Sequence, residues 1–354
     1  MSIPATMRAA RLHRVRADGQ PEVVSVDEVD VPEPGRDQVL VQVKACGVCA
    51  SDLHVVQGAT PHGPTLPQIL GHEPAGVVTA TGDGVEGWSP GDRVLFQMAR
   101  TCGECEACVA GRESLCASLR VPGIDVDGAQ AEYAVADSRF LVPMPPGLPF
   151  DQAAIMTDAV ATPYHALKRG GIGEGLTCAI FGLGGLGMHA LLLAKLAGAY
   201  VIGVDLDPVN LERATEWGAD GVVDASDGKP ARAIRALTGG GADRSFEFVG
   251  HPDTVSQAVK CLRPGGRATI VGLTPAEMRL MPEALFVAQE LEVVGSFGSG
   301  AQDLNELVDL VETGRLDLSR SITHHFDLDG FTDALRLLET REGHPIRMVV
   351  TYPD

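Results

Sequence analysis

Hydrophobic and polar positions alternate through much of the first 150 residues. The segment 39–48 (VLVQVKACGV) has the period of two that is typical of a half-buried strand, and shorter segments at 75–82, 92–96 and 131–136 resemble it. Turns rich in glycine and proline separate these segments. The run PMPPGLPF at 143–150 then marks a boundary. The pattern predicts a β-rich first domain.

The rhythm changes after residue 150, where short apolar segments alternate with segments of helical character. Six strands that alternate with helices predict a doubly wound parallel sheet, and therefore an α/β fold for this part of the chain. The expected strands are 178–182, 200–205, 220–225, 244–250, 267–273 and 291–297. The expected helices between and after them are 185–198, 208–219, 229–239, 253–263 and 282–290.

The last part of the chain contains two further helical patterns, at 301–314 and 329–340, and a final strand at 347–352. Because this part follows the sixth strand of the sheet, we assign it to the first domain. A chain of 354 residues is long enough for two domains. We predict one domain over 1–157, to which 298–354 return, and a second domain over 158–297.

Composition narrows the possible partners. The formal net charge is −19, which argues against nucleic acid or an anionic membrane as the main partner, because both select for Lys and Arg. The N-terminus has no apolar core after its basic residues, so we expect no secretory signal and a cytoplasmic location. The long apolar region 176–204 contains glycines, a histidine and a lysine, and we interpret it as a buried βαβ unit rather than a membrane span.

A glycine-rich turn follows the first strand of the expected sheet. Gly182, Gly184 and Gly187 fit the pattern G-x-G-x-x-G, in which the glycines allow a tight turn, approach of a pyrophosphate and close helix packing. Asp205 ends the next strand at the distance expected for the acid that binds the ribose hydroxyls. An acid there repels a 2′-phosphate, so the pattern favours NAD over NADP. The alternative is a glycine-rich turn that serves packing alone.

Four cysteines lie within fifteen residues. Cys102, Cys105, Cys108 and Cys116 have the spacing C-x2-C-x2-C-x7-C, which is typical of a closed tetrahedral zinc site. Four protein ligands leave no position for water or substrate, so the expected zinc is structural. An iron–sulfur cluster would use similar ligands, and two disulfides would need an oxidising compartment.

The chain resembles the zinc-dependent medium-chain alcohol dehydrogenases. GVCASDLH (47–54), LGHEPAGVV (70–78), GDRV (91–94), the four-cysteine segment and FGLGGLG (181–187) have the order and spacing of that family. The resemblance implies a GroES-like catalytic domain, a Rossmann coenzyme domain, and an active-site zinc in the cleft between them. It also implies reversible hydride transfer between an alcohol and NAD, in a homodimer or homotetramer.

The resemblance also implies a ligand set for the active-site zinc. Cys49 and His72 match two ligands, and Glu73 matches the carboxylate that can coordinate zinc during ligand exchange. Many relatives have a third cysteine where this chain has Asp158. Members with aspartate there occur, so we carry the ligand role to Asp158. The alternative for Asp158 is an exposed acid at the start of a helix.

Proton transfer is the next role that the resemblance implies. Ser51 matches the hydroxyl that contacts the substrate oxygen, and His54 matches the base that passes the proton to solvent. Asp52 is expected to accept a hydrogen bond from the nitrogen of His72 that does not bind metal.

The remaining coenzyme contacts come from the resemblance alone: Thr162 and Leu186 near the nicotinamide, and Arg347 on the pyrophosphate. Ala50 stands where the family often has a basic residue that contacts phosphate. We interpret three other cysteines as packing residues, and eight histidines have no partner pattern. These cysteines are Cys46, Cys178 and Cys261, and the histidines are His13, His62, His165, His189, His251, His324, His325 and His344.

Several functions stay open at this point. The partner is expected to be a small-molecule alcohol or carbonyl compound, and the pattern does not separate a simple alcohol from a polyol, an amino alcohol or a cyclic hydroxyacyl-CoA. A zinc-free quinone reductase and a non-catalytic NAD-binding protein are further alternatives. The loops 95–100 and 121–128 are expected to shape the substrate pocket, although strand packing explains Phe96 and Met98 equally well.

Overall fold

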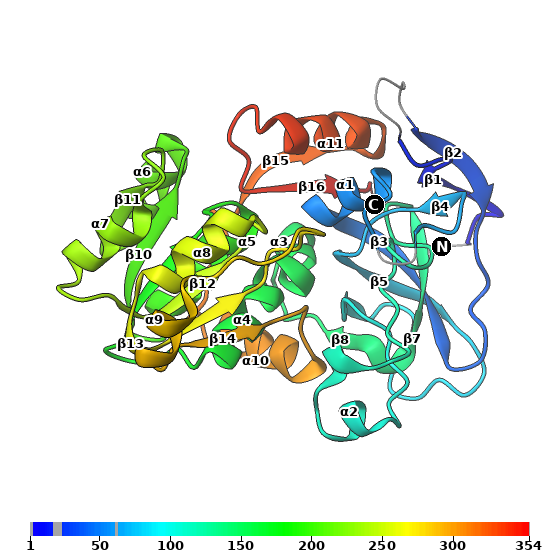
Figure 1. Ribbon diagram of the computed structural model, residues 1–354. Helices are drawn as coiled ribbons and strands as arrows, with labels where there is room; N and C mark the ends of the chain where they lie inside the picture. Colours follow the sequence, from blue (N-terminus) through cyan, green and yellow to red (C-terminus); the bar gives the residue numbers. More distant parts are fainter. Residues whose placement is uncertain (1–2, 17–22, 61–62, 354) are drawn as a thin grey trace. The chain divides into compact units, whose positions relative to one another are not determined.

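The computed structural model describes residues 3–16, 23–60 and 63–353, and its contacts divide the chain into two compact units (Figure 1). The first unit contains the described parts of Met1–Ala161 and Gly298–Asp354, and the second is Thr162–Phe297. The C-terminal part therefore belongs with the N-terminal part. The units divide after Ala161 rather than after residue 157, so Asp158 lies in the first unit.

The first unit is built on two β-sheets. A seven-stranded sheet has the order β15-β16-β3-β5-β6-β8, with β7 paired to β3, and a three-stranded sheet has the order β2-β1-β4. The strands of the larger sheet are β3 (Gln38–Val48), β5 (Pro74–Thr81), β6 (Arg93–Phe96), β7 (Tyr133–Asp137), β8 (Leu141–Pro143), β15 (Ile322–Phe326) and β16 (Arg347–Thr351). Those of the smaller sheet are β1 (Thr6–Leu12), β2 (Val24–Asp30) and β4 (Gln68–Ile69).

Helices and helical turns connect these strands. They are α1 (Ala50–Val56), α2 (Glu106–Val109), η1 (Glu113–Leu115), η2 (Ser138–Phe140), α3 (Phe150–Ile155), the π-helical turn η3 (Met156–Val160), α10 (Ala301–Glu312), η4 (Leu328–Gly330) and α11 (Phe331–Thr340). The predicted helices at 301–314 and 329–340 correspond to α10 and α11, each within a few residues.

The long strand β3 is the centre of the first unit. It pairs with β5, β7 and β16, so strands from the beginning, the middle and the end of the chain meet on it. Val39, Val41 and Val43 alternate along β3 and are fully buried in the main hydrophobic core. Because β3 is held from several sides, the residues at its carboxyl end have a well-defined position.

The second unit contains a six-stranded parallel sheet with the order β11-β10-β9-β12-β13-β14 (Figure 1). This is the order of a doubly wound dinucleotide-binding sheet, and it confirms the predicted fold class. The strands are β9 (Thr177–Phe181), β10 (Tyr200–Asp205), β11 (Gly221–Asp224), β12 (Ala242–Glu247), β13 (Leu262–Ile270) and β14 (Glu292–Gly295). The helices are α4 (Ala161–Gly170), α5 (Gly185–Leu196), α6 (Pro208–Glu216), α7 (Pro230–Leu237), α8 (Pro252–Lys260) and α9 (Glu283–Ala288).

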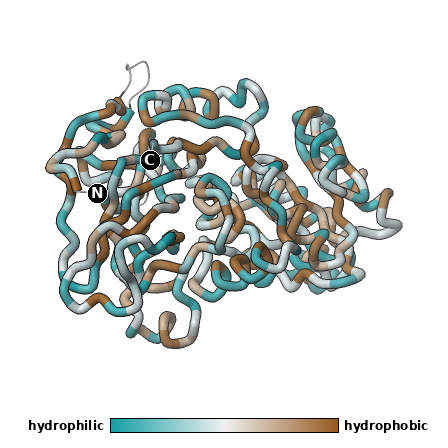
Figure 2. Tube along the Cα trace, turned by 180° about the vertical axis from the view of Figure 1, so that it is seen from behind, coloured by the Kyte–Doolittle hydropathy of each residue, from teal (hydrophilic) through white to brown (hydrophobic). Residues whose placement is uncertain are grey.

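The apolar region 176–204 forms β9, α5 and β10, as expected of a βαβ unit. Within the described part of the chain, no helix is both long and apolar enough to cross a membrane. Figure 2 shows hydrophobic and hydrophilic positions interspersed along the described chain. The cytoplasmic location expected from the sequence stays a prediction.

Candidate active site

Cys49 lies at the carboxyl end of β3, where the chain turns into α1. Its backbone is extended and caps that helix, and its N–H donates to Asp52 Oδ2 at 2.9 Å. Because the carboxylate three residues into the helix holds the amide, the thiol of Cys49 has a fixed direction. Cys49 is 2 % exposed.

His72 and Glu73 lie in the short connection between β4 and β5. Gly71 precedes them with φ of +94°, a conformation that L side chains rarely adopt, and a Cβ there would lie 2.8 Å from the backbone nitrogen of Gln130. The backbone of Glu73 is fixed against β3, since Gly47 N–H donates to Glu73 O at 3.0 Å. Both side chains are buried beside the end of β3.

Asp158 lies in the π-helical turn η3, between α3 and α4. Such turns insert an extra residue into a helix and are frequent at functional sites. Asp158 is only 6 % exposed, so it is not the solvent-exposed helix acid that the sequence left open. The segment from 150 to 170 is helical throughout and contains two acids, Asp151 and Asp158. Only Asp158 is buried, and it lies in the π-helical turn.

These three elements bring four donor side chains together. Cys49, His72, Glu73 and Asp158 are all buried, and one ligand atom from each lies within 4.8 Å of the others. Cys49 Sγ is 3.5 Å from Asp158 Oδ2, and His72 Nε2 is 3.6 Å from the same oxygen. A tetrahedral zinc ion with ordinary bond lengths would separate such donor atoms by about 3.3 to 3.6 Å.

Three nitrogen and oxygen atoms of this group are buried without a hydrogen-bond partner among the described residues: His72 Nδ1, His72 Nε2 and Glu73 Oε2. Buried polar atoms are rarely left without a partner, and such exceptions call for an explanation such as an ion. A sulfur, an imidazole and a carboxylate are also the donors that zinc prefers. The residues therefore fit a zinc ion.

The electrostatics of the metal-free group agree with this. Burial disfavours a charged Cys49, but Arg347 and His72 hold the pKa of its thiol below the ordinary value. Burial also disfavours a charged His72, yet Asp158 and Asp52 raise the pKa of its imidazole well above the ordinary value. Without a metal, the proton on His72 therefore offsets the carboxylates, and a metal ion would displace that proton.

Asp52 lies beside His72, near the position that the resemblance implies, but Asp52 Oδ1 and His72 Nδ1 form no hydrogen bond. Asp52 Oδ1 is 3.5 Å from His72 Nδ1, and both side chains are almost completely buried. The other oxygen of Asp52 is held by the amide of Cys49. One carboxylate thus holds the backbone of Cys49 and lies beside the ring of His72.

Arg347 lies in the same buried group. Its guanidinium forms an ion pair with Glu73 Oε1, lies 3.8 Å from Asp158 Oδ2 and is 3 % exposed. The sequence pattern did not indicate these contacts, because Arg347 and Glu73 are 274 positions apart. A role for Arg347 on the pyrophosphate stays a prediction.

Ser51 and His54 lie three residues apart on α1, and therefore on one side of that helix. Ser51 Oγ lies 3.8 Å from Cys49 Sγ. The side chains of Ser51 and His54 are partly exposed. Partial burial lowers the pKa of the His54 imidazole below 6.5. A neutral imidazole at neutral pH is able to accept a proton.

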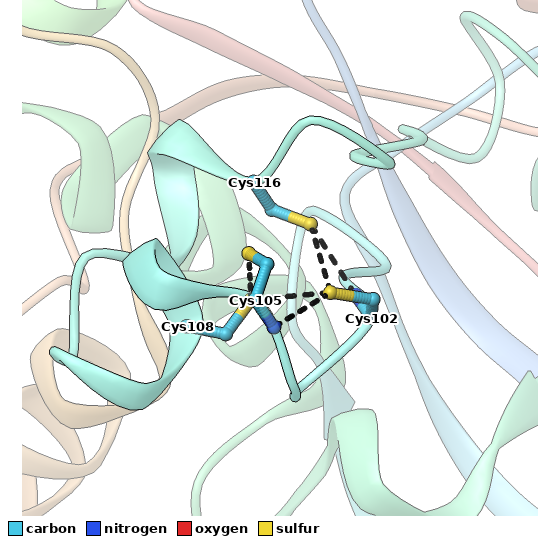
Figure 3. A group of neighbouring side chains, drawn as sticks. All are labelled: Cys102, Cys105, Cys108 and Cys116. Carbon is cyan, nitrogen blue, oxygen red and sulfur yellow. Dashed lines mark hydrogen bonds between the residues drawn. The ribbon is translucent and has the colours of Figure 1, made fainter.

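The four cysteines at 102–116 form a second group, shown in Figure 3. The Sγ–Sγ distances are 3.5 Å between Cys105 and Cys108, 3.6 Å between Cys102 and Cys116, and 3.9 Å between Cys102 and Cys108. Zinc–sulfur bonds of about 2.3 Å in a tetrahedron would place the sulfurs about 3.8 Å apart. All four are free thiols, so the disulfide alternative is wrong for this structure.

Backbone amides surround this cysteine group. The N–H groups of Glu104 and Cys105 lower the pKa of the Cys102 thiol to about 6, and burial raises that of Cys108 to about 11. Amides that point at sulfur favour the thiolate, which is the form that binds zinc. The group fits a structural zinc ion.

The glycine-rich turn lies between β9 and α5, at the carboxyl edge of the parallel sheet. A Cβ on Gly187 would lie 1.7 Å from Gly182 O, and one on Gly182 would lie 2.7 Å from a methyl group of Val249. A Cβ on Gly184 would meet no protein atom within 4 Å. Packing therefore requires a glycine at positions 182 and 187. At Gly184 the space that a side chain would fill is empty and accessible to a ligand.

Asp205 ends β10 beside this turn. Its carboxylate accepts from Leu183 N at 2.6 Å, Leu206 N at 2.8 Å and Asp207 N at 2.9 Å. The sequence did not indicate that Asp205 also holds the glycine-rich turn. Thr162 lies near the start of α4 and is buried, and Leu186 lies in the first turn of α5.

Other residues named from the sequence lie in the hydrophobic interior. Cys46, Cys178 and Cys261 are fully buried, as expected of packing residues, and Cys46 and Cys261 belong to hydrophobic clusters. Met98 is also buried in a hydrophobic cluster, as strand packing would explain. Phe96 is buried in another cluster and also lines a small pocket together with His72 and Arg100. His62 lies outside the described residues.

Comparison with known proteins identifies two regions. Residues 35–146 match the alcohol dehydrogenase GroES-like domain, and residues 185–313 match the zinc-binding dehydrogenase domain. Together they cover most of the chain. An alcohol dehydrogenase from Geobacillus stearothermophilus is 38 % identical over 83 % of this chain and 87 % of its own length.

A sorbitol dehydrogenase from Bacillus subtilis is 31 % identical over 100 % of this chain and 99 % of its own length. A solved NAD-dependent alcohol dehydrogenase superposes with a TM-score of 0.89 at 31 % identity, over 98 % of this chain and 100 % of that one. The fold, the two donor groups and these likenesses agree. The chain therefore belongs to the medium-chain, zinc-type alcohol dehydrogenase family, and the protein is an oxidoreductase.

Proposed function

We propose that this protein transfers hydride reversibly between a small-molecule alcohol and NAD, giving an aldehyde or a ketone. The observation that carries the proposal is the convergence of buried Cys49, His72 and Asp158 from three separate elements. Burial of an imidazole and carboxylates without hydrogen-bond partners costs free energy of folding. A protein that had kept only the fold would gain nothing that offsets this cost.

We assign Cys49, His72 and Asp158 as the ligands of one zinc ion, and Cys102, Cys105, Cys108 and Cys116 as those of a second, structural one. When bound with an open position, the first zinc supplies a Lewis acid that makes an alcohol more acidic. Cys49 and Asp158 contribute two negative charges that balance the charge of a divalent ion, while His72 stays neutral. Asp52 keeps His72 in the required orientation.

The proton released on oxidation is assigned to Ser51 and His54. The hydroxyl of Ser51 lies beside Cys49, and His54 lies one helical turn further along α1. His54 is half-buried and neutral near pH 7, so it is suited to accept a proton and pass it to solvent.

For the coenzyme, we assign the turn at Gly182, Gly184 and Gly187 to the pyrophosphate, since amides at the start of α5 favour an anion. Asp205 is assigned to the ribose hydroxyls, and Thr162 and Leu186 to the nicotinamide end. The Asp205 carboxylate accepts three amides, and it can accept one further hydrogen bond because it has about four acceptor sites.

A polyol is the second candidate substrate. The full-length likeness to a sorbitol dehydrogenase favours it, and the chemistry at the reacting carbon would be the same. Amino alcohols and cyclic hydroxyacyl-CoA compounds would undergo the same reaction, and their recognition would need additional charged groups of the protein.

The test is a screen for NADH formation over primary, secondary, aromatic and polyol substrates, with zinc measured on the same sample. We expect two zinc ions per chain and turnover of at least one class. A chain with a single zinc ion in the cysteine group, or one that turns over no alcohol, would contradict the proposal.

Coenzyme choice gives a separate prediction. Asp205→Ala should lower the preference for NAD over NADP by at least roughly tenfold, because the repulsion of a 2′-phosphate is lost. The ratio of kcat/KM for the two coenzymes measures this. An unchanged ratio would show that the ribose is recognised by other residues.

We also infer a homo-oligomer. The edge strand β14 lies beside α9, which exposes Leu285 and Val287 and buries no residue completely. An open edge with exposed apolar neighbours suits pairing with a second copy. Light scattering on the purified protein tests this inference, and a monomer at micromolar concentration would overturn it.

A further inference from the structure

The carboxylate of Glu73 occupies the space where most residues would have a side chain on β3. If Gly47 carried a Cβ, that atom would lie 2.1 Å from Glu73 Oε2, 2.9 Å from Glu73 Cδ and 3.0 Å from Glu73 Cβ. The three nearest atoms therefore all belong to one side chain. A contact of 2.1 Å is far shorter than van der Waals packing allows, so an alanine at this position would force the carboxylate to move.

The backbone gives no other reason for a glycine here. Gly47 is the last residue but one of β3, and it does not have a positive φ. Glycine within a strand destabilises it relative to residues with side chains, unless another group approaches closely. At position 47 the group that approaches is the candidate metal carboxylate.

The surrounding backbone is held in place, so the clash cannot be relieved by a shift of the strand. Gly47 N–H donates to Glu73 O at 3.0 Å, and Gly47 O accepts from Gln130 Nε2 at 3.1 Å. Gln130 Oε1 in turn accepts from Tyr352 at 3.0 Å. The side chain of Glu73 is the part that is able to give way.

The present position of Glu73 is set from two sides. Oε1 forms the ion pair with Arg347, whereas Oε2 lies against Gly47 and has no hydrogen-bond partner in the described part of the chain. Oε1 is also 3.9 Å from His72 Nε2, at the edge of the candidate ligand group. A carboxylate pushed away from β3 would lose its place on Arg347, and the candidate ligands lie within 4.8 Å of it.

We propose that Gly47 is a positioning residue for the metal site. Because Gly47 has no side chain, the carboxylate of Glu73 fits against β3, where it pairs with Arg347 and stays away from the fourth metal position. This inference rests on the proposed zinc site. Gly47 does not touch the reacting atoms and acts only through Glu73. A methyl group at position 47 would turn Glu73 toward Cys49, His72 and Asp158, where it would compete with the substrate.

The first test is a double-mutant cycle on the metal-free protein, read out by thermal unfolding. Gly47→Ala should lower the apparent Tm by several degrees when Glu73 is present. In the Glu73→Ala background the same substitution should change the apparent Tm by about one degree or less. Alanine at position 73 removes the two closest atoms, Oε2 and Cδ, and keeps only Cβ at 3.0 Å. Equal shifts in both backgrounds would overturn the proposal.

Should Gly47→Ala be insoluble by itself, solubility provides the same comparison. Recovery of soluble protein in Gly47→Ala combined with Glu73→Ala would support the proposal, and insolubility of both would overturn it. Glu73→Asp is a second background, which keeps the negative charge next to Arg347 while removing one methylene.

The second test uses the protein with cobalt in place of zinc, since the visible spectrum of cobalt reports its ligand geometry. We expect Gly47→Ala to change this spectrum, to raise the KM for the alcohol more than it lowers kcat, and to slow removal of the metal by a chelator. When Glu73→Asp is combined with Gly47→Ala, the cobalt spectrum should return toward that of the unsubstituted protein. Identical spectra and unchanged KM would overturn the proposal.

The two proposals fail in different ways. If the unsubstituted protein takes up no metal outside the cysteine group, the proposed zinc site is wrong, and the cobalt comparison fails with it. If that protein takes up two metal ions and turns over an alcohol but Gly47→Ala behaves the same, only the role of Gly47 is wrong.

Discussion

The two groups of metal donors in this chain are built in opposite ways. Cys102, Cys105, Cys108 and Cys116 come from fifteen consecutive residues, and three of the four are partly exposed. Cys49, His72, Glu73 and Asp158 come from three separate elements, and all four are buried. The local group needs a short loop to form, whereas the dispersed group needs the folded first unit.

The difference in burial corresponds to a difference in chemistry. Four thiolates around one zinc ion fill every position, so that ion can order a loop but cannot bind a substrate. The dispersed group has three donors together with Glu73, which is turned onto Arg347. Removing a donor should therefore impair activity in one group and stability in the other.

The largest effect is expected at the dispersed group. Asp158→Ala or Cys49→Ser should lower kcat/KM by more than about a thousandfold, since neither variant keeps the three donors of a catalytic zinc site. Each should keep one zinc of two and a folded chain. Metal analysis with steady-state kinetics checks this, and normal activity in either variant would refute the ligand assignment.

At the cysteine group, Cys105→Ser should release the other zinc ion and lower the apparent Tm by roughly 5 °C or more, because metal binding contributes directly to folding. We expect new proteolytic cleavage within 102–116 and retention of the first zinc. A variant with unchanged Tm and two zinc ions would show that these thiols do not bind the metal.

A smaller effect should separate the groups further, because only the dispersed one has a supporting carboxylate. Asp52→Asn keeps the size of the side chain but removes the charge beside His72 Nδ1. Loss of such a partner typically costs about 10- to 100-fold in metal affinity or activity. Competition with a chelator measures this for each zinc ion, and the affinity of the cysteine group should stay the same.

The smallest effect concerns proton transfer beside the dispersed group. His54→Ala should slow alcohol oxidation by about tenfold, mainly below neutral pH, where hydroxide is too scarce to replace the imidazole. In the unsubstituted protein, the rate should rise with pH through the pKa of His54, which burial holds below 6.5. This rise should vanish in the variant. A loss of equal size at every pH would remove the relay role.

The sequence predicted the second unit closely. The six strands at 178–297 all occur, and they have the order of a doubly wound sheet. Each of these strands is a short apolar segment followed by a helix, so its place in the sheet depends on local periodicity and on the handedness of βαβ connections. In the first unit, the strands β1, β2, β4, β8 and β15 were not predicted. In β1, the exposed Arg8 lies between the buried Met7 and Ala9, but Ala10 is buried as well, so the alternation is interrupted and the hydrophobic signal is weak.

The four-cysteine group could also be predicted from the sequence, because its ligand spacing is set by a short segment of chain. The contacts of Glu73 could not be predicted. Arg347 is separated from it by most of the chain, and Gly47 by 26 positions of strand and loop, so no spacing rule connects them. The π-helical turn that buries Asp158 has no sequence pattern either, since a helical periodicity places that residue near a helix start.

The sequence by itself thus determined the fold class, the nucleotide turn and the local cysteine site, because each depends on residues that are close along the chain. Only the tertiary structure decided that Asp158 is buried and that Arg347 pairs with Glu73, and on it rests the proposal that Gly47 makes room for this pair. Burial is the physical reason: charges and carboxylates removed from water must be paired, and the chain pairs them through contacts that form only when β3, β5 and β16 lie side by side.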